Sequence, residues 1–203
     1  MSHDPYANPR KTATIRRLGP VDIAALKAAV LALPESVWDA ENADKPNRFE
    51  ALDKTRHIVF RFVDSVRDWR GSHDRPAWAE WRALLEPVMQ AAAAPYGYAH
   101  GQFPRVMFAR MAPGGEIKPH RDANAAAKWP HKIHVPLLTN DKVTFFVDSV
   151  GYHMPEGEAA EVNNMSVHAV KNDGDTDRIH LIFEYFDPDQ PAPEWLAKVL
   201  ANG

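Results

Sequence analysis

A series of short runs of β-branched and aromatic residues, each closed by turn-forming residues, occupies residues 103–186 and most constrains the fold of this chain. Such runs are typical of antiparallel strands, and strands repeated at this spacing favour a sandwich or a barrel. The turns contain the residues that tight turns prefer, as in Pro113-Gly114-Gly115 and Asn172-Asp173-Gly174. We predict strands near residues 104–111, 132–138, 142–148, 158–162, 166–170 and 178–186.

The first hundred residues have a different pattern, and we expect this N-terminal part to be mainly helical. Residues 22–31 carry helix-forming residues with apolar side chains at helical spacing, and Pro34 predicts the end of that helix. A second helix is expected to start at an Asp74 cap and to run through Met89. Pro87 should kink or divide this helix because proline lacks the N–H that the helix needs.

A strand and a terminal helix complete the expected organisation. Residues 56–63 have the β-branched and aromatic content of a strand, and residues 193–200 predict a short helix packed on the outside. We expect a single domain over residues 1–203, made of a helical part packed on the core (1–100), a β-sandwich or barrel core (101–187) and a C-terminal helix (188–203).

The composition excludes several classes of protein. Hydrophobic residues make up 45% and charged residues 25% of the chain, as in ordinary globular proteins. The formal net charge is -3, so no basic field attracts nucleic acid, and we expect no nucleic-acid partner. The absence of cysteine excludes disulfides, thiolate metal sites and cysteine nucleophiles. No apolar segment has the length of a signal peptide or membrane span, so we expect a cytoplasmic protein without membrane insertion.

His120 and Asp122 form a His-x-Asp pair, and a second histidine, His168, follows later in the chain. Residues i and i+2 of a strand point to the same side, so one strand end can supply two metal ligands. Two neutral imidazoles and one carboxylate form the facial triad that holds Fe(II) and leaves positions open for substrate and O₂. The sequence therefore predicts an iron oxygenase site built from these three residues.

Two of the predicted strands, 132–138 and 178–186, alternate polar with apolar residues. A polar strand face normally meets solvent, but in a small barrel it can turn inward around a charged ligand. The two faces would then converge on an anion, because both carry cationic residues. Their polar residues are Lys132 and His134 in the first strand and Arg178, His180 and Glu184 in the second.

Five segments resemble the core of the aspartyl/asparaginyl β-hydroxylase family: PGGEIKPHRD, KIHVPLLTN, VTFFVDSVGYHMPEGEAAEVNN, HAVKNDG and DRIHLIFEYF. That family consists of Fe(II)- and 2-oxoglutarate-dependent oxygenases with a double-stranded β-helix, or jelly-roll (cupin-like), core. The resemblance covers residues 104–186 in order, whereas the first hundred residues show no such match. It implies a mainly β fold with flanking helices (α+β), with Fe(II) as cofactor, 2-oxoglutarate as cosubstrate, and O₂.

The resemblance also implies roles for particular residues. His120 and His168 would ligate iron, and Arg178 would pair with the C5 carboxylate of 2-oxoglutarate. Asp122 completes the triad, as in the bacterial members, whereas the animal members lack this carboxylate. Two residues fall where the family places an arginine and a histidine near the other end of the cosubstrate: Lys132 and His134. The implied reaction is hydroxylation of an unactivated C–H bond, such as the β-carbon of an Asp/Asn-type residue, in a small molecule or peptide.

Two alternative functions remain open from the sequence. A cupin-like metal enzyme that does not use 2-oxoglutarate would need the triad but not Arg178. A non-catalytic jelly-roll binding protein would use its histidines for structure only. A kinase is excluded, because Ala127 occupies the place where the His-Arg-Asp loop needs an asparagine, and no glycine-rich loop is present.

Other polar residues are expected to face solvent. His131 and His153 lie near turns, where polar side chains are usually exposed. The acids from Glu156 to Glu161 should mark a solvated hairpin. The polar stretch from Asn47 to Arg56 is expected to be a solvated loop.

Overall fold

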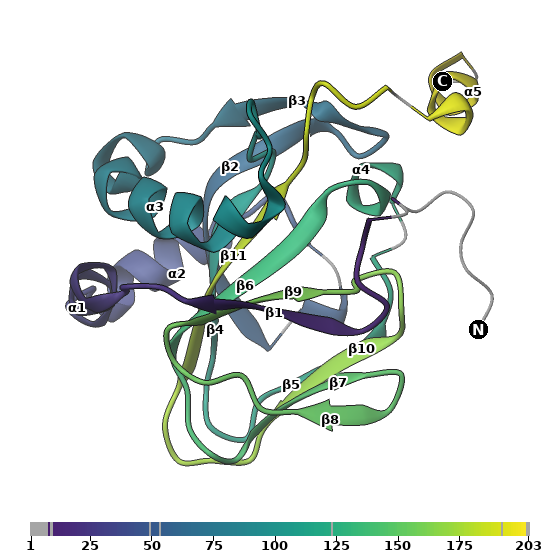
Figure 1. Ribbon diagram of the computed structural model, residues 1–203. Coiled ribbons are helices and arrows are strands. Elements are labelled where there is room, and N and C mark those ends of the chain that lie inside the picture. Colours follow the sequence, from purple (N-terminus) through teal and green to yellow (C-terminus); the bar gives the residue numbers. More distant parts are fainter. Residues whose placement is uncertain are drawn as a thin grey trace.

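Two antiparallel sheets form the body of the protein (Figure 1). The computed structural model describes residues 8, 10–48, 50–52, 54–122, 124–191 and 193–201. The strands are β1 (Ile15–Pro20), β2 (Thr55–Ser65), β3 (Asp68–Asp74), β4 (Val106–Met111), β5 (Glu116–His120), β6 (His131–Leu138), β7 (Val143–Val147), β8 (Val150–Tyr152), β9 (Glu158–Val162), β10 (His168–Asn172) and β11 (Arg178–Tyr185). The large sheet has the order β1-β9-β6-β11-β4-β2-β3 and the small sheet β5-β10-β7-β8.

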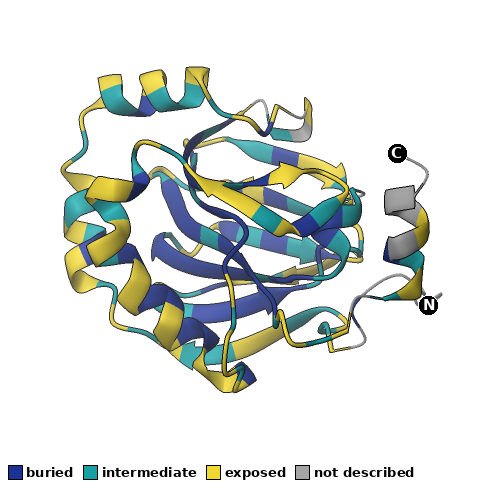
Figure 2. Ribbon diagram, turned by 90° about the horizontal axis from the view of Figure 1, so that it is seen from above, coloured by how far each residue is buried: buried dark blue, intermediate teal, exposed yellow. Residues whose placement is uncertain are grey.

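Helices flank these sheets. The α-helices are α1 (Ala24–Leu31), α2 (Glu35–Ala43), α3 (Trp78–Ala93), α4 (Ala125–Lys128) and α5 (Glu194–Ala201), and short 3-10 turns span Glu50–Leu52 and Ala94–Tyr96. Figure 2 shows buried strands in the centre and helices with exposed outer faces beside them. No helix in the described part of the chain has the length and apolarity needed to cross a membrane.

The main hydrophobic core lies between the helices and the outer face of the large sheet. Apolar residues of α1, α2 and α3 pack there against β2, β4, β6 and β11. Phe108 of β4 is fully buried and makes edge-to-face contacts with Phe60, at 4.8 Å between ring centroids, and Trp81, at 5.3 Å. A second cluster, with Ile117, Phe145, Val162 and Val170 among its members, belongs to strands of both sheets. The result is the jelly-roll arrangement that the sequence predicted.

Strand β11 lies at the centre of the large sheet, between β6 and β4. Seven of its eight positions are buried, including the polar residues Arg178, His180 and Glu184. The usual rule that polar residues of an alternating strand face solvent therefore does not hold here. This polar face instead turns into the interior of the jelly roll.

The structure confirms the strands predicted after residue 103 and adds two that the sequence did not indicate, β5 and β8. The N-terminal part supplies strands as well as helices, since β1 pairs with β9 and β2 pairs with β4. It therefore extends the large sheet in addition to covering it. The missed strands are short or polar, so they lack the apolar periodicity that signals a strand.

The second predicted helix differs from the observed helix in its start and in the effect of its proline. Asp74 ends β3, and the helix α3 begins only at Trp78, without a side-chain cap. Pro87 lies inside α3 but does not divide it. Both Pro87 and Ala83, whose carbonyl loses its helical partner, are exposed, so water can hydrogen-bond that carbonyl.

His131 and Glu161 were expected in solvent, and this expectation is wrong. Both are fully buried, and His131 Nδ1 lies 2.7 Å from Glu161 Oε1. Arg16 of β1 pairs with the other carboxylate oxygen at 2.9 Å, and Tyr98 Oη lies 2.8 Å from His131 Nε2. Strand β1 pairs with β9 and brings Arg16 to Glu161, a carboxylate that the local sequence places in a polar hairpin. His153 is exposed, as expected.

We predict that Phe108→Ala lowers the free energy of unfolding by about 3–5 kcal/mol, because it leaves a cavity among aromatic rings. Urea unfolding followed by tryptophan fluorescence measures this change. Val150→Ala, at a residue 54% exposed, is the control and should change stability by less than about 0.5 kcal/mol. Equal effects of the two substitutions would contradict the assigned core.

Candidate metal centre

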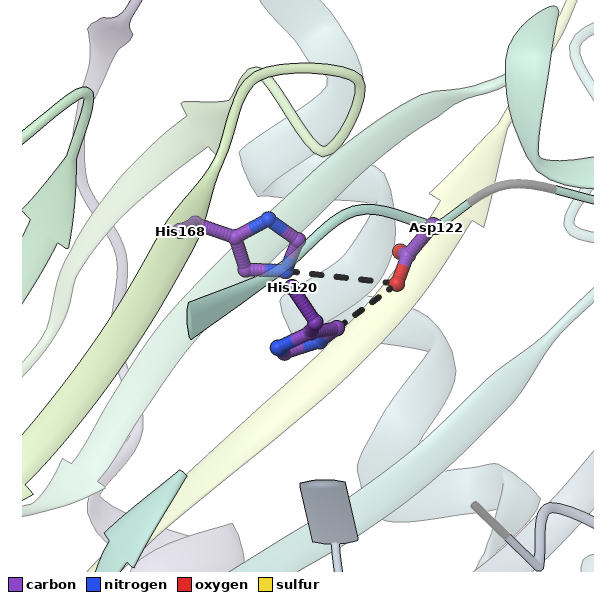
Figure 3. Close-up of side chains that lie close together, drawn as sticks. All are labelled: His120, Asp122 and His168. Carbon is purple, nitrogen blue, oxygen red and sulfur yellow. Dashed lines mark ion pairs between the residues drawn. The ribbon is translucent and has the colours of Figure 1, made fainter. Parts of the chain in front are cut away.

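His120, Asp122 and His168 converge at one end of the small sheet (Figure 3). His120 ends β5, His168 begins β10, and the two are opposite each other in the antiparallel pairing of these strands. Asp122 Oδ1 lies 3.7 Å from His120 Nε2 and 3.9 Å from His168 Nε2. One ligand atom from each residue lies within 4.8 Å of the others, so the three could hold one metal ion.

Backbone carbonyls orient both imidazoles. His120 Nδ1 donates to the carbonyl of Lys118 at 2.8 Å, and His168 Nδ1 donates to that of Ser166 at 3.1 Å. A carbonyl only accepts, so in each neutral ring Nδ1 carries the hydrogen and Nε2 keeps its lone pair for a metal. Burial lowers the pKa of His168 to about 4, which keeps this ring neutral at neutral pH.

The two oxygens of Asp122 have different partners. Oδ2 accepts from Lys132 Nζ at 2.5 Å and from Asn164 Nδ2 at 3.1 Å, while Oδ1 faces the histidines. Burial alone would raise the pKa of Asp122, but Lys132 and the two histidines hold it below its usual range. Asp122 is therefore an ionised carboxylate with one oxygen directed toward the candidate metal position.

A lysine from the segment before β1 fixes the orientation of Asn164. Lys11 Nζ donates to Asn164 Oδ1 at 2.6 Å and to the carbonyl of Ala127 at 2.8 Å. Burial lowers the pKa of Lys11 to about 8, so it is still mostly protonated at neutral pH. An ammonium group only donates, so the oxygen of the Asn164 amide must face Lys11 and its NH₂ must face Asp122.

Arg178, at the start of β11, is buried without a carboxylate partner among the described residues. Arg178 is 1% exposed, and its Nη2 donates to His180 Nδ1 at 2.8 Å. Its Nε and Nη1 have no hydrogen-bond partner, and neither has His134 Nε2. Burial lowers the pKa of Arg178 to about 9. A buried guanidinium without an anion is unfavourable, so this group is suited to an anion that enters from solution.

One pocket, open to solvent, is lined by both the triad and Arg178. Its lysine and arginine residues, among those described, are Arg105, Lys132 and Arg178. Arg105 pairs with Glu184 at 2.7 Å, and Lys132 pairs with Asp122 at 2.5 Å. Arg178 is thus the pocket cation left for an external anion.

All six site residues predicted from the sequence line this pocket: His120, Asp122, Lys132, His134, His168 and Arg178. Lys132 is placed against Asp122, which the sequence did not indicate. Asn47 was expected in a solvated loop, but it is 4% exposed and lines the pocket. Sequence reasoning also missed Lys11, Asn164 and Arg105. Only Arg105 had a local signal, as a cation at the start of a predicted strand.

Comparison with known proteins identifies one matching family model. The model, described as Aspartyl/Asparaginyl beta-hydroxylase, matches residues 82–188. No curated protein matches the chain.

Similar solved structures share the fold of the chain. One is AviO1 from Streptomyces viridochromogenes Tue57, with 18% identity, a TM-score of 0.55, and coverage of 89% of this chain and 93% of that one. A 2OG-Fe(II) oxygenase family oxidoreductase from Burkholderia pseudomallei has 15% identity, a TM-score of 0.52, and coverage of 88% and 93%. At these identities the likeness shows the fold alone, which agrees with the jelly-roll core.

We predict that the protein loses stability as the pH falls from about 6.5 to 3, because its pocket contains neutral buried histidines. Burial, and then Lys45, lower the pKa of His57 from 6.5 to about 3. Between these values the unfolded chain binds a proton that the folded chain does not, so protonation favours unfolding. Each histidine that the fold holds neutral in this way contributes up to about 1.4 kcal/mol per pH unit to the pH dependence of the free energy of unfolding.

His57→Gln should reduce that slope by about one proton between pH 4 and 6, measured by urea unfolding at several pH values. His153→Gln, at an exposed position, is the matched control and should leave the slope unchanged. Parallel pH profiles for wild type and His57→Gln would show that His57 is not held neutral in the fold.

Proposed function

Because this chain belongs to the aspartyl/asparaginyl β-hydroxylase family, we propose that the triad and Arg178 are the iron and 2-oxoglutarate sites of its active centre. The protein is an oxidoreductase of the Fe(II)- and 2-oxoglutarate-dependent hydroxylase class, and its reaction uses O₂. The residue assignment rests on the different partners of the three cationic side chains that line the pocket. Two have carboxylate partners, and Arg178, at the end of the pocket, has none among the described residues.

The donor set of the triad fits Fe(II). His120 and His168 offer imidazole nitrogens and Asp122 offers one carboxylate oxygen, all on one side of the candidate metal position. This nitrogen-rich set with a single carboxylate is the one that non-haem Fe(II) oxygenases use, and it leaves coordination positions for other reactants. The missing partners of Arg178 supply a separate argument for the cosubstrate.

The far carboxylate of 2-oxoglutarate fits the buried guanidinium of Arg178. Nε and Nη1 of Arg178 are unpartnered donors, and a carboxylate in the pocket could accept a charge-assisted hydrogen bond from either of them. His134 Nε2 is also unpartnered and lies in the same pocket. A cupin-like enzyme that does not use 2-oxoglutarate gives no role to this arginine, so the structure favours the 2-oxoglutarate-dependent reaction.

The residues of the chain hold and shield the reactants. When bound, iron supplies the redox chemistry that couples decarboxylation of 2-oxoglutarate and consumption of O₂ to hydroxylation of a C–H bond. Lys132 and Asn164 occupy one oxygen of Asp122 and so leave the other for the metal. Phe145 lies parallel to the His168 ring, at 6.1 Å between centroids, and helps to exclude water from that side.

We propose that the substrate is a small molecule or peptide with an Asp/Asn-type group that is hydroxylated at its β-carbon, as the family name suggests. We also propose that residues 1–203 act as a single domain, because strands from both halves of the chain share the large sheet. The cytoplasm remains the proposed location, since a chain without cysteine is compatible with a reducing compartment.

Arg178→Ala should weaken 2-oxoglutarate binding about 30-fold or more, because charge-assisted hydrogen bonds to the far carboxylate are lost. Calorimetric titration of the Mn(II)-loaded protein with 2-oxoglutarate measures the affinity. Arg110→Ala is the matched control: Arg110 is opposite Ile179, the residue after Arg178, in the pairing of β4 and β11, but it pairs with Asp177 and Glu35. Wild-type affinity in Arg178→Ala would contradict the assignment and favour the cupin-like alternative.

Lys11→Met should weaken Mn(II) binding about 10-fold or more, because Asn164 no longer has a fixed amide orientation toward Asp122. Electron paramagnetic resonance of free Mn(II) measures the binding without turnover. Lys27→Met removes a lysine that pairs with Glu156 away from the pocket, and it should bind Mn(II) normally. Unchanged affinity in Lys11→Met would show that Lys11 serves the fold alone.

A further inference from the structure

The ion pair of Arg105 and Glu184 lies at the opposite end of the pocket from Arg178. Arg178, Ile182 and Glu184 line the pocket from one face of β11, and Glu184 lies six positions after Arg178, roughly 20 Å along the strand. Glu184 is opposite Lys132 in the pairing of β11 with β6, and Lys132 contacts Asp122. The pair is therefore next to the triad, on the side away from the proposed 2-oxoglutarate site.

The pair is buried and rigidly held. The side chains of Arg105 and Glu184 are 8% and 4% exposed, and Nη1 of Arg105 donates to Oε1 of Glu184 at 2.7 Å. Nη2 donates to Asn124 Oδ1 at 3.3 Å, and the Asn124 side chain also accepts from the backbone N–H of Ala127. The guanidinium lies 5.2 Å from the centre of the Phe62 ring. These contacts fix the guanidinium in one orientation.

One donor and one acceptor of this pair remain unused. Arg105 Nε and Glu184 Oε2 have no hydrogen-bond partner among the described residues. Buried polar atoms are nearly always hydrogen-bonded, and a buried ion pair is seldom more stable than an apolar replacement. Because both side chains line the pocket, a bound molecule can supply the missing partners.

The charged side chains that line this end of the pocket are paired with one another. Arg105 is paired with Glu184 and Lys132 with Asp122, whereas the ammonium of Lys11, which is also near Glu184, does not line the pocket. An anionic group bound here would meet Glu184 with no unpaired cation among the lining residues at this end, and this repulsion disfavours it. A neutral group with one acceptor and one donor can accept from Arg105 Nε and donate to Glu184 Oε2 without adding charge to the pocket.

We infer that Arg105 and Glu184 form a substrate subsite that binds a neutral amide, with its C=O on Arg105 Nε and its N–H on Glu184 Oε2. This inference rests on the proposed function, because it places the amide beside the iron site. It makes the substrate one that presents a side-chain carboxamide and disfavours one that presents a carboxylate at this position.

The test compares two probes that differ only in this group, N-acetyl-L-asparagine methylamide and N-acetyl-L-aspartate methylamide. Each is titrated calorimetrically into the Fe(II)- and 2-oxoglutarate-loaded protein without oxygen, so that binding is measured in the absence of turnover. The asparagine probe should bind about 10-fold or more tightly than the aspartate probe. Equal binding, or tighter binding of the aspartate probe, overturns the inference.

Glu184→Gln gives a sharper test because it keeps the shape but leaves Arg105 as an uncompensated cation. The preference should then shift about 10-fold or more toward the aspartate probe, while 2-oxoglutarate affinity stays unchanged. Glu158→Gln, which removes an exposed partner of Arg17, is the matched control and should keep the wild-type preference. An unshifted preference in Glu184→Gln overturns the subsite.

Binding of neither probe, with 2-oxoglutarate still bound, also overturns the amide subsite but leaves the proposed function standing. Failure of the wild-type protein to bind 2-oxoglutarate would instead overturn the proposed function. The 2-oxoglutarate titration of each variant also shows whether the variant is folded, so a misfolded protein is not mistaken for a changed preference.

Discussion

Charges buried between the two sheets need partners, and this requirement organises the pocket. The most important contact is the ion pair of Asp122 with Lys132, since it keeps a partly buried carboxylate ionised and turns one of its oxygens toward two histidines. The pair of Arg105 with Glu184 satisfies the same requirement nearby. Arg178 does not satisfy it within the described chain, and this exception indicates where an external anion belongs.

The N-terminal part of the chain contributes to the site and not only to its cover. Strand β1 pairs with β9, where Arg16 and Glu161 form an ion pair, and this pairing holds the preceding segment across the sheet. Lys11 of that segment reaches Asn164, which contacts Asp122. The orientation of a candidate metal ligand therefore depends on a residue far away in the sequence. Removal of the segment that contains Lys11 would therefore remove this contact.

The sequence predicted the parts of the fold and site that local patterns determine. Period-two runs indicated the strands of the jelly roll, and the His-x-Asp spacing placed two candidate ligands on one strand end. His168 and Arg178 were linked to them by turn residues and by resemblance to a family. These features depend on neighbours within a few residues, or on a motif whose order along the chain is fixed.

The missed features depend on which strands become neighbours. His131 and Glu161 are polar residues beside turns, and their burial follows from β1 beside β9 and from Tyr96 and Tyr98 against His131. The contact of Lys11 with Asn164 has no local signal, because it joins residues 153 positions apart. Pro87 was misjudged for a related reason: an exposed helix face tolerates a proline that a buried face would not.

The most direct test of the iron and 2-oxoglutarate sites is an anaerobic titration of the protein with Fe(II) and 2-oxoglutarate, followed by visible absorption spectroscopy. Chelation of iron by 2-oxoglutarate gives a weak metal-to-ligand charge-transfer band, which requires both sites to be formed at once and no knowledge of the substrate. We expect a band that saturates at one equivalent of each reactant. Iron binding without this band would contradict the 2-oxoglutarate site, and failure to bind iron would contradict the metal centre itself.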